Sequence, residues 1–72
     1  MTVLEMKLQF CKKILALRIE NGLTLPELAR RSGVSLTMLE ELERGVLPKR
    51  MMVDDAWKLA EAFDCKPAEL FR

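Results

Sequence analysis

The feature that most constrains this sequence is a pair of short helical segments separated by one glycine-centred turn. Ala29, Gly33, Leu39 and Leu42 stand at offsets 0, 4, 10 and 13. The small residue at position 29 lets two helices approach closely, and Gly33 permits a sharp reversal with a positive φ. Leu39 and Leu42 share one side of the second segment and anchor it from within. The outer side of that segment is therefore free to meet another molecule.

The sequence predicts an all-α chain, because apolar residues recur at helical spacing and no stretch alternates as a strand does. We expect five helices: residues 4–21 before Gly22, a second opening at Thr24, a third from Ser35 to Gly45, a fourth from near Asp54 to Phe63, and a short one at 66–71. Residues 46–52 are expected to form a loop. A length of 72 residues suffices for one small domain, 1–72, and no more.

Capping signals mark the starts of the second and third helices. Thr24 is followed three residues later by Glu27, which is the spacing of a capping box. Pro26 fits between them, because amides of the first turn have no helical partner. Ser35 is a suitable cap for the third helix. These signals predict two helices that begin at fixed residues on either side of the turn.

The apolar positions at helical spacing predict one core. Its expected members are Phe10, Ile14, Leu17, Leu28, Ala29, Val34, Leu39, Leu42, Ala60 and Phe63. On the fourth helix the expected inner face comprises Val53, Ala56, Leu59, Ala60 and Phe63. Trp57 lies slightly off that face, so we expect it at the core edge, with an interface anchor as the alternative.

Composition excludes several classes of protein. Lys and Arg number 12 against 11 acidic residues, so the net charge is only +1 and any affinity for nucleic acid depends on where the basic residues lie. No apolar run reaches the roughly 18 residues of a membrane span, and no signal peptide is visible. Cys11 and Cys65 without histidine cannot complete a zinc site. We therefore expect a cytoplasmic protein with reduced cysteines.

Four motifs at these positions resemble the phage-repressor-like (Cro/repressor, XRE-type) helix-turn-helix domains, over residues 13–71. They are LRIENGLT at 17–24, ELARRSGVS at 27–35, LERG at 42–45 and LAEAF at 59–63. The resemblance implies a compact five-helix, lambda-repressor-like fold in which helices two and three form the helix-turn-helix. It also implies a homodimer on palindromic double-stranded DNA, with no catalysis and no cofactor. Arg18 and Glu43 are implied to pair as a structural clamp.

The resemblance also implies a set of DNA-binding positions. They are Thr24, Leu25, Ser35, Leu36, Thr37, Glu40, Glu41, Lys49 and Arg50. Leu25 stands where the family commonly has Gln, and residues 36–38 are Leu-Thr-Met where it has Arg, Gln or Ser. Residues 36–44 hold three Glu and one Arg, which gives a net charge of −2 on a helix meant to face a polyanion. Base edges are read best by Arg, Asn and Gln, so direct base reading is expected to be poor.

These departures leave two hypotheses open. The first is a sequence-specific, DNA-binding transcriptional regulator. The second is a protein-interaction module, an anti-repressor or antitoxin-like partner that keeps the fold but binds DNA weakly or not at all, as an acidic and apolar reading face suggests. An enzyme is disfavoured, because the sequence offers no histidine, no nucleophile–base pair and no glycine-rich phosphate loop.

Overall fold

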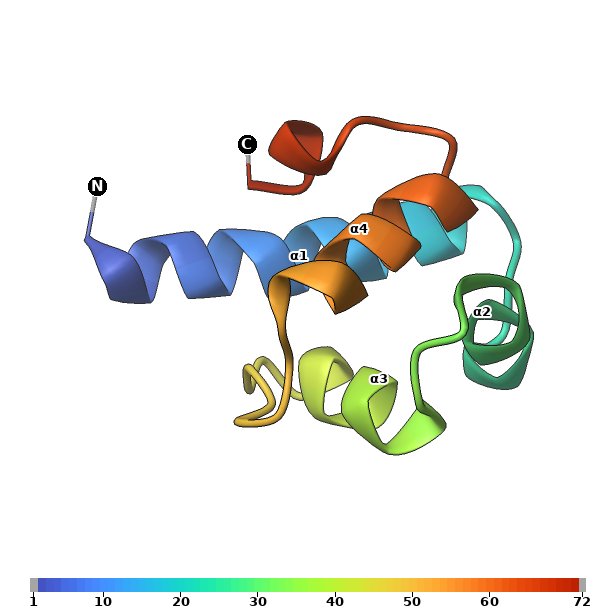
Figure 1. Ribbon diagram of the computed structural model, residues 1–72, viewed down its shortest axis with the longest axis horizontal. Coiled ribbons are helices and arrows are strands. Elements are labelled where there is room, and N and C mark those ends of the chain that lie inside the picture. The colour runs from blue at the N-terminus through green and yellow to red at the C-terminus, as the bar shows by residue number, and fades with distance from the viewer. Residues whose placement is uncertain (1, 72) are drawn as a thin grey trace.

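Helices account for every regular element in the computed structural model, which describes residues 2–71 (Figure 1). The elements are α1 (Val3–Glu20), α2 (Leu25–Ser32), α3 (Leu36–Glu43), α4 (Val53–Ala62) and a 3₁₀ helix, η1 (Pro67–Phe71). No strand occurs within residues 2–71, so the all-α class is confirmed. The expected count of five α-helices is not confirmed: the last segment, Pro67–Phe71, is a 3₁₀ helix, a form that proteins use in short pieces.

Two helix starts differ slightly from the expected residues, and caps explain both. α1 begins at Val3 because the Thr2 hydroxyl accepts a hydrogen bond from the Glu5 amide at 3.1 Å. α4 begins at Val53 rather than near Asp54, since the Asp55 carboxylate accepts a bond from the Met52 amide at 2.9 Å. Acidic side chains at such starts also complement the positive end of the helix dipole.

One apolar core joins all five elements. Its buried members are Phe10, Cys11, Ile14, Leu23, Leu28, Val34, Leu39, Leu42, Leu59, Ala60, Phe63 and Leu70. Leu17 and Ala29, which were expected in the core, are only partly buried and pack against its margin. The Phe71 ring stacks on Phe10 with centroids 5.0 Å apart, so η1 covers one side of α1.

The expected inner face of α4 is wrong at its first position. Leu59 and Ala60 are buried, but Val53 is 78% exposed. Trp57 is 55% exposed, so it does not lie at the core edge either. Compared with the expected orientation, α4 is rotated about its axis, so that Leu59 and Phe63 face the core. This rotation places the stripe formed by Val53 and Trp57 toward solvent.

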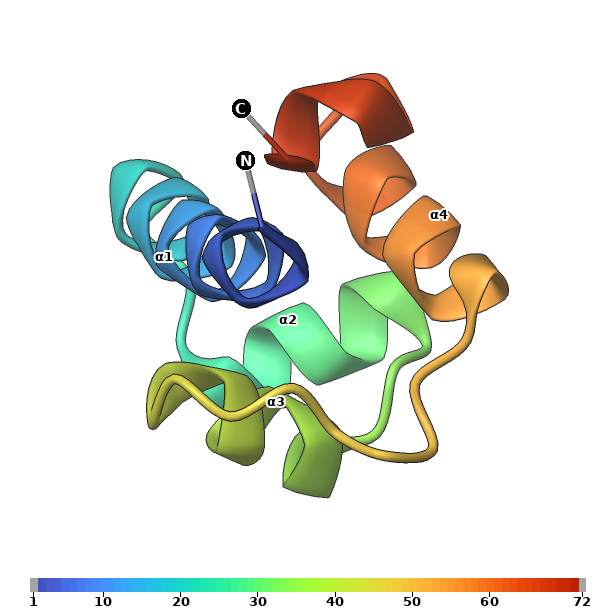
Figure 2. The same cartoon turned by 90° about the vertical axis from the view of Figure 1, so that its left-hand side faces the viewer.

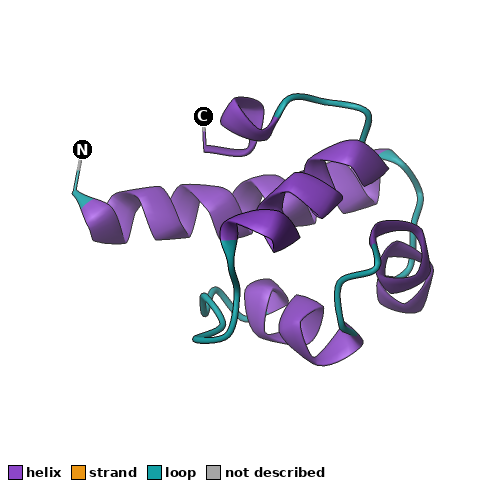
Figure 3. Ribbon diagram, in the orientation of Figure 1, coloured by secondary structure: helices purple, strands orange, loops and turns teal. Residues whose placement is uncertain are grey.

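The arrangement leaves α3 at the rim of the molecule. In two perpendicular views α3 lies along the lower edge and η1 on the opposite side, while α1 crosses the middle in Figure 1 and is seen end-on in Figure 2. Residues 44–52 form the loop that connects α3 to α4 (Figure 3). The inner side of α3 packs on α1 and α2, and its outer side is uncovered. No helix within residues 2–71 is long and apolar enough to cross a membrane.

Replacing Leu39 with alanine should destabilise the fold strongly. The side chain is 1% exposed, so truncation removes buried methyl groups and leaves a cavity between α3 and the core. We expect a loss of about 2–5 kcal/mol in the free energy of unfolding, measured by urea denaturation. The matched control is Leu36→Ala in the same helix, where the side chain is 39% exposed and a much smaller loss is expected. Equal losses in the two variants would contradict the placement of α3.

Candidate nucleic-acid interface

The turn between α2 and α3 is held by a buried serine and a glycine. The Ser32 hydroxyl donates to the Leu28 carbonyl at 2.7 Å and accepts from the Val34 amide at 3.1 Å. Gly33 ends α2 with φ 79°, and its amide bonds to the Ala29 carbonyl at 2.9 Å. The positive φ expected of Gly33 is confirmed. A side chain at that position would be strained, so the angle between the two helices depends on this glycine.

Both helices of the motif begin at the capping residues that the sequence predicts. The Thr24 hydroxyl accepts from the Glu27 amide at 3.2 Å, and the Glu27 carboxylate accepts from the Thr24 amide at 3.0 Å. Donation to the Glu27 carboxylate, first from the Thr24 backbone amide and then from the Thr24 side chain, holds the pKa of Glu27 below its ordinary value. The Ser35 hydroxyl accepts from the Met38 amide at 3.2 Å. Further first-turn amides at each start have no helical partner and can meet an anion.

The outer face of α3 carries the predicted reading positions. Leu36, Thr37 and Glu40 are exposed, whereas Glu41 is half-buried. Leu39 and Leu42, on the opposite side of the helix, are buried. α3 is therefore fixed from inside and presents a short row of mixed polar and apolar side chains outward.

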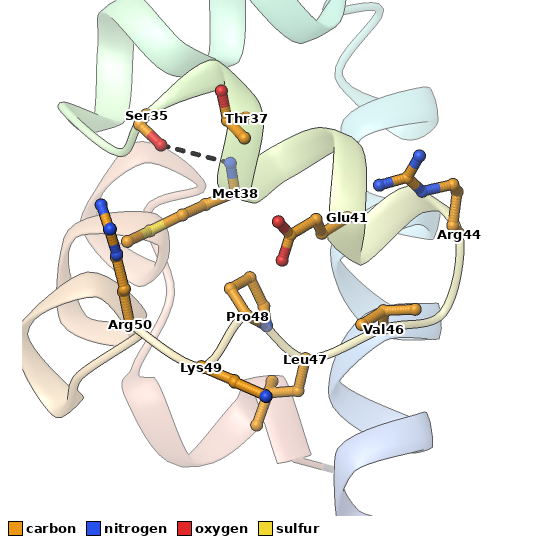
Figure 4. A pocket seen from close by; sticks show the side chains of 10 residues that line it. All are labelled: Ser35, Thr37, Met38, Glu41, Arg44, Val46, Leu47, Pro48, Lys49 and Arg50. Atoms are coloured by element: carbon orange, nitrogen blue, oxygen red, sulfur yellow. Dashed lines mark hydrogen bonds between the residues drawn. The ribbon is translucent and has the colours of Figure 1, made fainter.

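A groove of about 870 Å³ runs between α3 and the loop that follows it (Figure 4). The Arg50 side chain reaches from the loop toward Met38 in the first turn of α3, while the Glu41 carboxylate points into the groove above Pro48 (Figure 4). Arg44 stands at the other end of the groove. The groove is lined by Ser35, Thr37, Met38, Glu41, Arg44, Val46, Leu47, Pro48, Lys49 and Arg50.

The predicted positions do not all meet in one place. Five of them, Ser35, Thr37, Glu41, Lys49 and Arg50, line the groove. Leu36 and Glu40 lie on α3 outside its lining, and Thr24 and Leu25 lie at the start of α2.

Sequence reasoning missed Arg44 and the apolar floor of the groove. The floor comes from Met38, Val46, Leu47 and Pro48. The signal for Arg44 was its spacing, because positions 37, 41 and 44 follow one another at i, i+4 and i+7 along a helix face. No sequence pattern indicated the apolar floor, because three of its residues lie in a loop, where side chains do not follow a helical spacing.

The charge of α3 is less unfavourable than the count of its residues suggests. Arg18 Nε donates a hydrogen bond to the Glu43 carboxylate, and Arg18 Nη1 donates to the Leu23 carbonyl at 2.8 Å. Glu43 therefore faces α1 and is neutralised there. Only Glu40 and Glu41 remain as acidic side chains on the outer part of α3, and Arg44, Lys49 and Arg50 line the same groove as Glu41.

The comparisons with known proteins agree with this architecture. The family model described as Helix-turn-helix, HTH_3, matches residues 14–70. The chain belongs to the HTH_3 helix-turn-helix family. The predicted relation to XRE-type helix-turn-helix domains is thereby confirmed.

A solved structure shares the fold closely. It is an HTH_3 family transcriptional regulator from Vibrio cholerae, 30% identical in sequence, with a TM-score of 0.82. The match covers 97% of this chain but only 38% of the Vibrio cholerae protein, so this chain spans well under half of that protein's length. A search of curated proteins finds no match.

The Arg18–Glu43 pair yields a stability prediction. Both side chains are about one-fifth exposed, at 21% and 20%, so removing one partner leaves the other poorly solvated. Replacing Arg18 or Glu43 alone with methionine should each cost about 1–3 kcal/mol. The double replacement should cost less than the sum, because it leaves no unpaired charge. Urea denaturation of the four proteins measures this coupling, and strictly additive losses would show that the pair is not a clamp.

Proposed function

We propose that this chain is a transcriptional regulator that binds double-stranded DNA as a homodimer through α3. Residues 1–72 would act as one DNA-binding domain, without catalysis or cofactor, in the cytoplasm. The observation that carries the proposal is the exposed outer side of α3, which lies beside a groove with three basic residues. The similar structure from Vibrio cholerae, which has the same fold, is a transcriptional regulator. A helix held in this way has the shape that enters the major groove.

Phosphate contacts supply most of the affinity in this proposal. Lys49 and Arg50 are exposed on the loop beside α3, and Arg50 reaches toward the first turn of the helix. The starts of α2 and α3, at Thr24 and Ser35, present free amides and the positive ends of helix dipoles. Such contacts fix the position of a protein on DNA without reading its sequence.

Fewer residues are placed to contact base edges than to contact phosphates. Thr37 and Glu41 face the groove on one side of α3. A carboxylate accepts a hydrogen bond from the cytosine amino group, a threonine hydroxyl suits several base edges, and Leu36 can contact only a thymine methyl. The proposal therefore predicts low discrimination between DNA sequences, and a second copy on a palindromic site would double the number of contacts.

A second candidate function rests on the same face. Leu36 is 39% exposed and Val46 is 51% exposed, and the acidic Glu40 lies beside Leu36 in α3. A surface with apolar and acidic side chains suits a protein partner better than a polyanion. In this alternative the chain keeps the fold and acts as an interaction module.

The salt dependence of DNA binding tests the phosphate contacts. With about two to three phosphates neutralised by each copy, the slope of log K against log salt for a dimer should be about −4 to −5, since each contact contributes about −0.9. The variant Lys49→Ala with Arg50→Ala should weaken binding to all duplexes alike and flatten this slope. The matched control, Lys12→Ala with Lys66→Ala, removes the same charge at exposed positions outside the groove. Identical slopes for both variants would exclude the loop from the interface.

Glu41→Gln tests which side of α3 faces DNA. The substitution removes repulsion from the phosphates and supplies an amide that can pair with adenine, so affinity should rise several-fold. Glu40→Gln is the control of equal charge one residue away, outside the lining of the groove, and should gain less. Titration at several salt concentrations against operator-like and random duplexes measures both. No binding by the native chain at low salt, with no gain from Glu41→Gln, would favour the interaction module instead.

A further inference from the structure

We propose that two copies of this chain associate through the outer face of α4, which packs against the same face of a second copy in antiparallel orientation. The inference rests on the proposed dimer and names the surface that forms it. Three side chains at the start of α4 are largely exposed: Met52 at 70%, Val53 at 78% and Trp57 at 55%. Tryptophan is the residue type most favoured at the centre of interfaces, and an exposed one beside two other apolar residues is unusual for a free surface.

Over its first two turns, the outer face of α4 carries two parallel rows of side chains, and Glu61, which is also exposed, follows Trp57 by four residues near the end of the helix. Val53 and Trp57 are four residues apart and form an apolar row. Asp54 and Lys58, also four residues apart, form a charged row beside it, and all four residues are exposed. Within residues 53–58, apolar and charged side chains are therefore separated into two rows rather than mixed.

These rows are complementary to themselves under two-fold symmetry. When a helix pairs with an antiparallel copy about a two-fold axis, each row meets the same row of the other copy in reverse order. Trp57 of each copy then packs on Val53 of the other. Asp54 of each copy then faces Lys58 of the other, so opposite charges meet at both ends of the contact.

The start of α1 is a weaker candidate for the same role. Val3 and Leu4 are 68% and 65% exposed, which is comparable to the apolar row of α4. Its one carboxylate, Glu5, is already bonded to Thr2 in the capping box, so no charged row of alternating sign remains for a second copy. Charge complementarity thus favours α4.

The position of α4 suits a dimer that also binds DNA. α4 lies at the flank of the molecule, whereas α3 forms its lower edge (Figure 2). Pairing through the flank therefore leaves the outer sides of both α3 helices uncovered. Three apolar side chains per copy bury less than the roughly 800 Å² per partner of a stable complex, so association should be weak in free solution, with a dissociation constant of about 0.1–1 mM.

The single tryptophan of the chain reports directly on this contact. Without DNA, its emission should shift to shorter wavelength as the native protein is concentrated, in step with dimer formation in sedimentation equilibrium. Val53→Lys should weaken self-association at least about tenfold, while helix content by circular dichroism stays unchanged because the side chain is exposed. Leu4→Lys, a matched change at the start of α1, should leave self-association as in the native chain. Loss of association in Leu4→Lys but not in Val53→Lys would overturn the proposal, as would a native chain that stays monomeric at millimolar concentration.

A charge swap tests the antiparallel register. Asp54→Lys and Lys58→Glu should each weaken the dimer, because like charges then face one another. The double variant restores opposite charges and should recover most of the native association constant. Failure of the double variant to recover it, when its thermal stability at low concentration matches that of the single variants, would exclude this register.

The two proposals can fail separately. Self-association is measured without DNA, and DNA binding is measured on short half-site duplexes at concentrations where the protein is monomeric. A chain that dimerises but does not bind DNA would contradict the proposed function and would leave the α4 contact standing. Half-site binding by a chain that never dimerises would exclude the α4 contact and the homodimer, and would leave DNA binding through α3 standing.

Discussion

The helix-turn-helix exists here only because its inner side is buried. α2 and α3 have eight residues each, and isolated helices of that length are not stable in water. Leu28 and Leu39, at 0% and 1% exposed, fix both helices to the core, and Thr24 and Ser35 cap their free starts. The outer surface of α3 is therefore held in position by the packing of the opposite side of the helix.

Arg18 adds a directed contact between elements to this packing. Its guanidinium joins the end of α3, at Glu43, to the carbonyl of Leu23 ahead of α2, and it stands in the last turn of α1. A hydrogen-bonded cation at this junction specifies direction, which apolar contacts do not. The same bond removes a negative charge from the part of α3 that faces outward, so one interaction both orients the helix and makes it more compatible with a polyanion.

The sequence predicted those features that depend on neighbouring residues. The capping box at Thr24, the cap at Ser35 and the positive φ of Gly33 were all foreseen, because each follows from local geometry. The orientation of Val53 and Trp57 was not foreseen, because the rotation of α4 about its axis depends on how Leu59 and Phe63 pack in the core. The groove beside α3 was also missed, because the loop that forms it has no period. The Arg18–Glu43 pair was expected only through the family resemblance, because the two residues are 25 positions apart and no local pattern links them.

A nearly neutral chain can bind DNA only by separating its charges, and the fold does this in part. Glu43 is paired internally, while Lys49 and Arg50 remain exposed at the rim of the groove. Glu40 and Glu41 still oppose the phosphates, so a single copy is expected to bind weakly and with little preference. Two weak contacts reinforce each other when they act together, because the first binding event raises the effective concentration for the second. Self-association through α4 and binding to each half-site would both be weak. Together they would give stable binding only where two half-sites lie at the right spacing. In the proposed dimer, specificity would therefore arise more from the spacing of two half-sites than from base contacts made by α3.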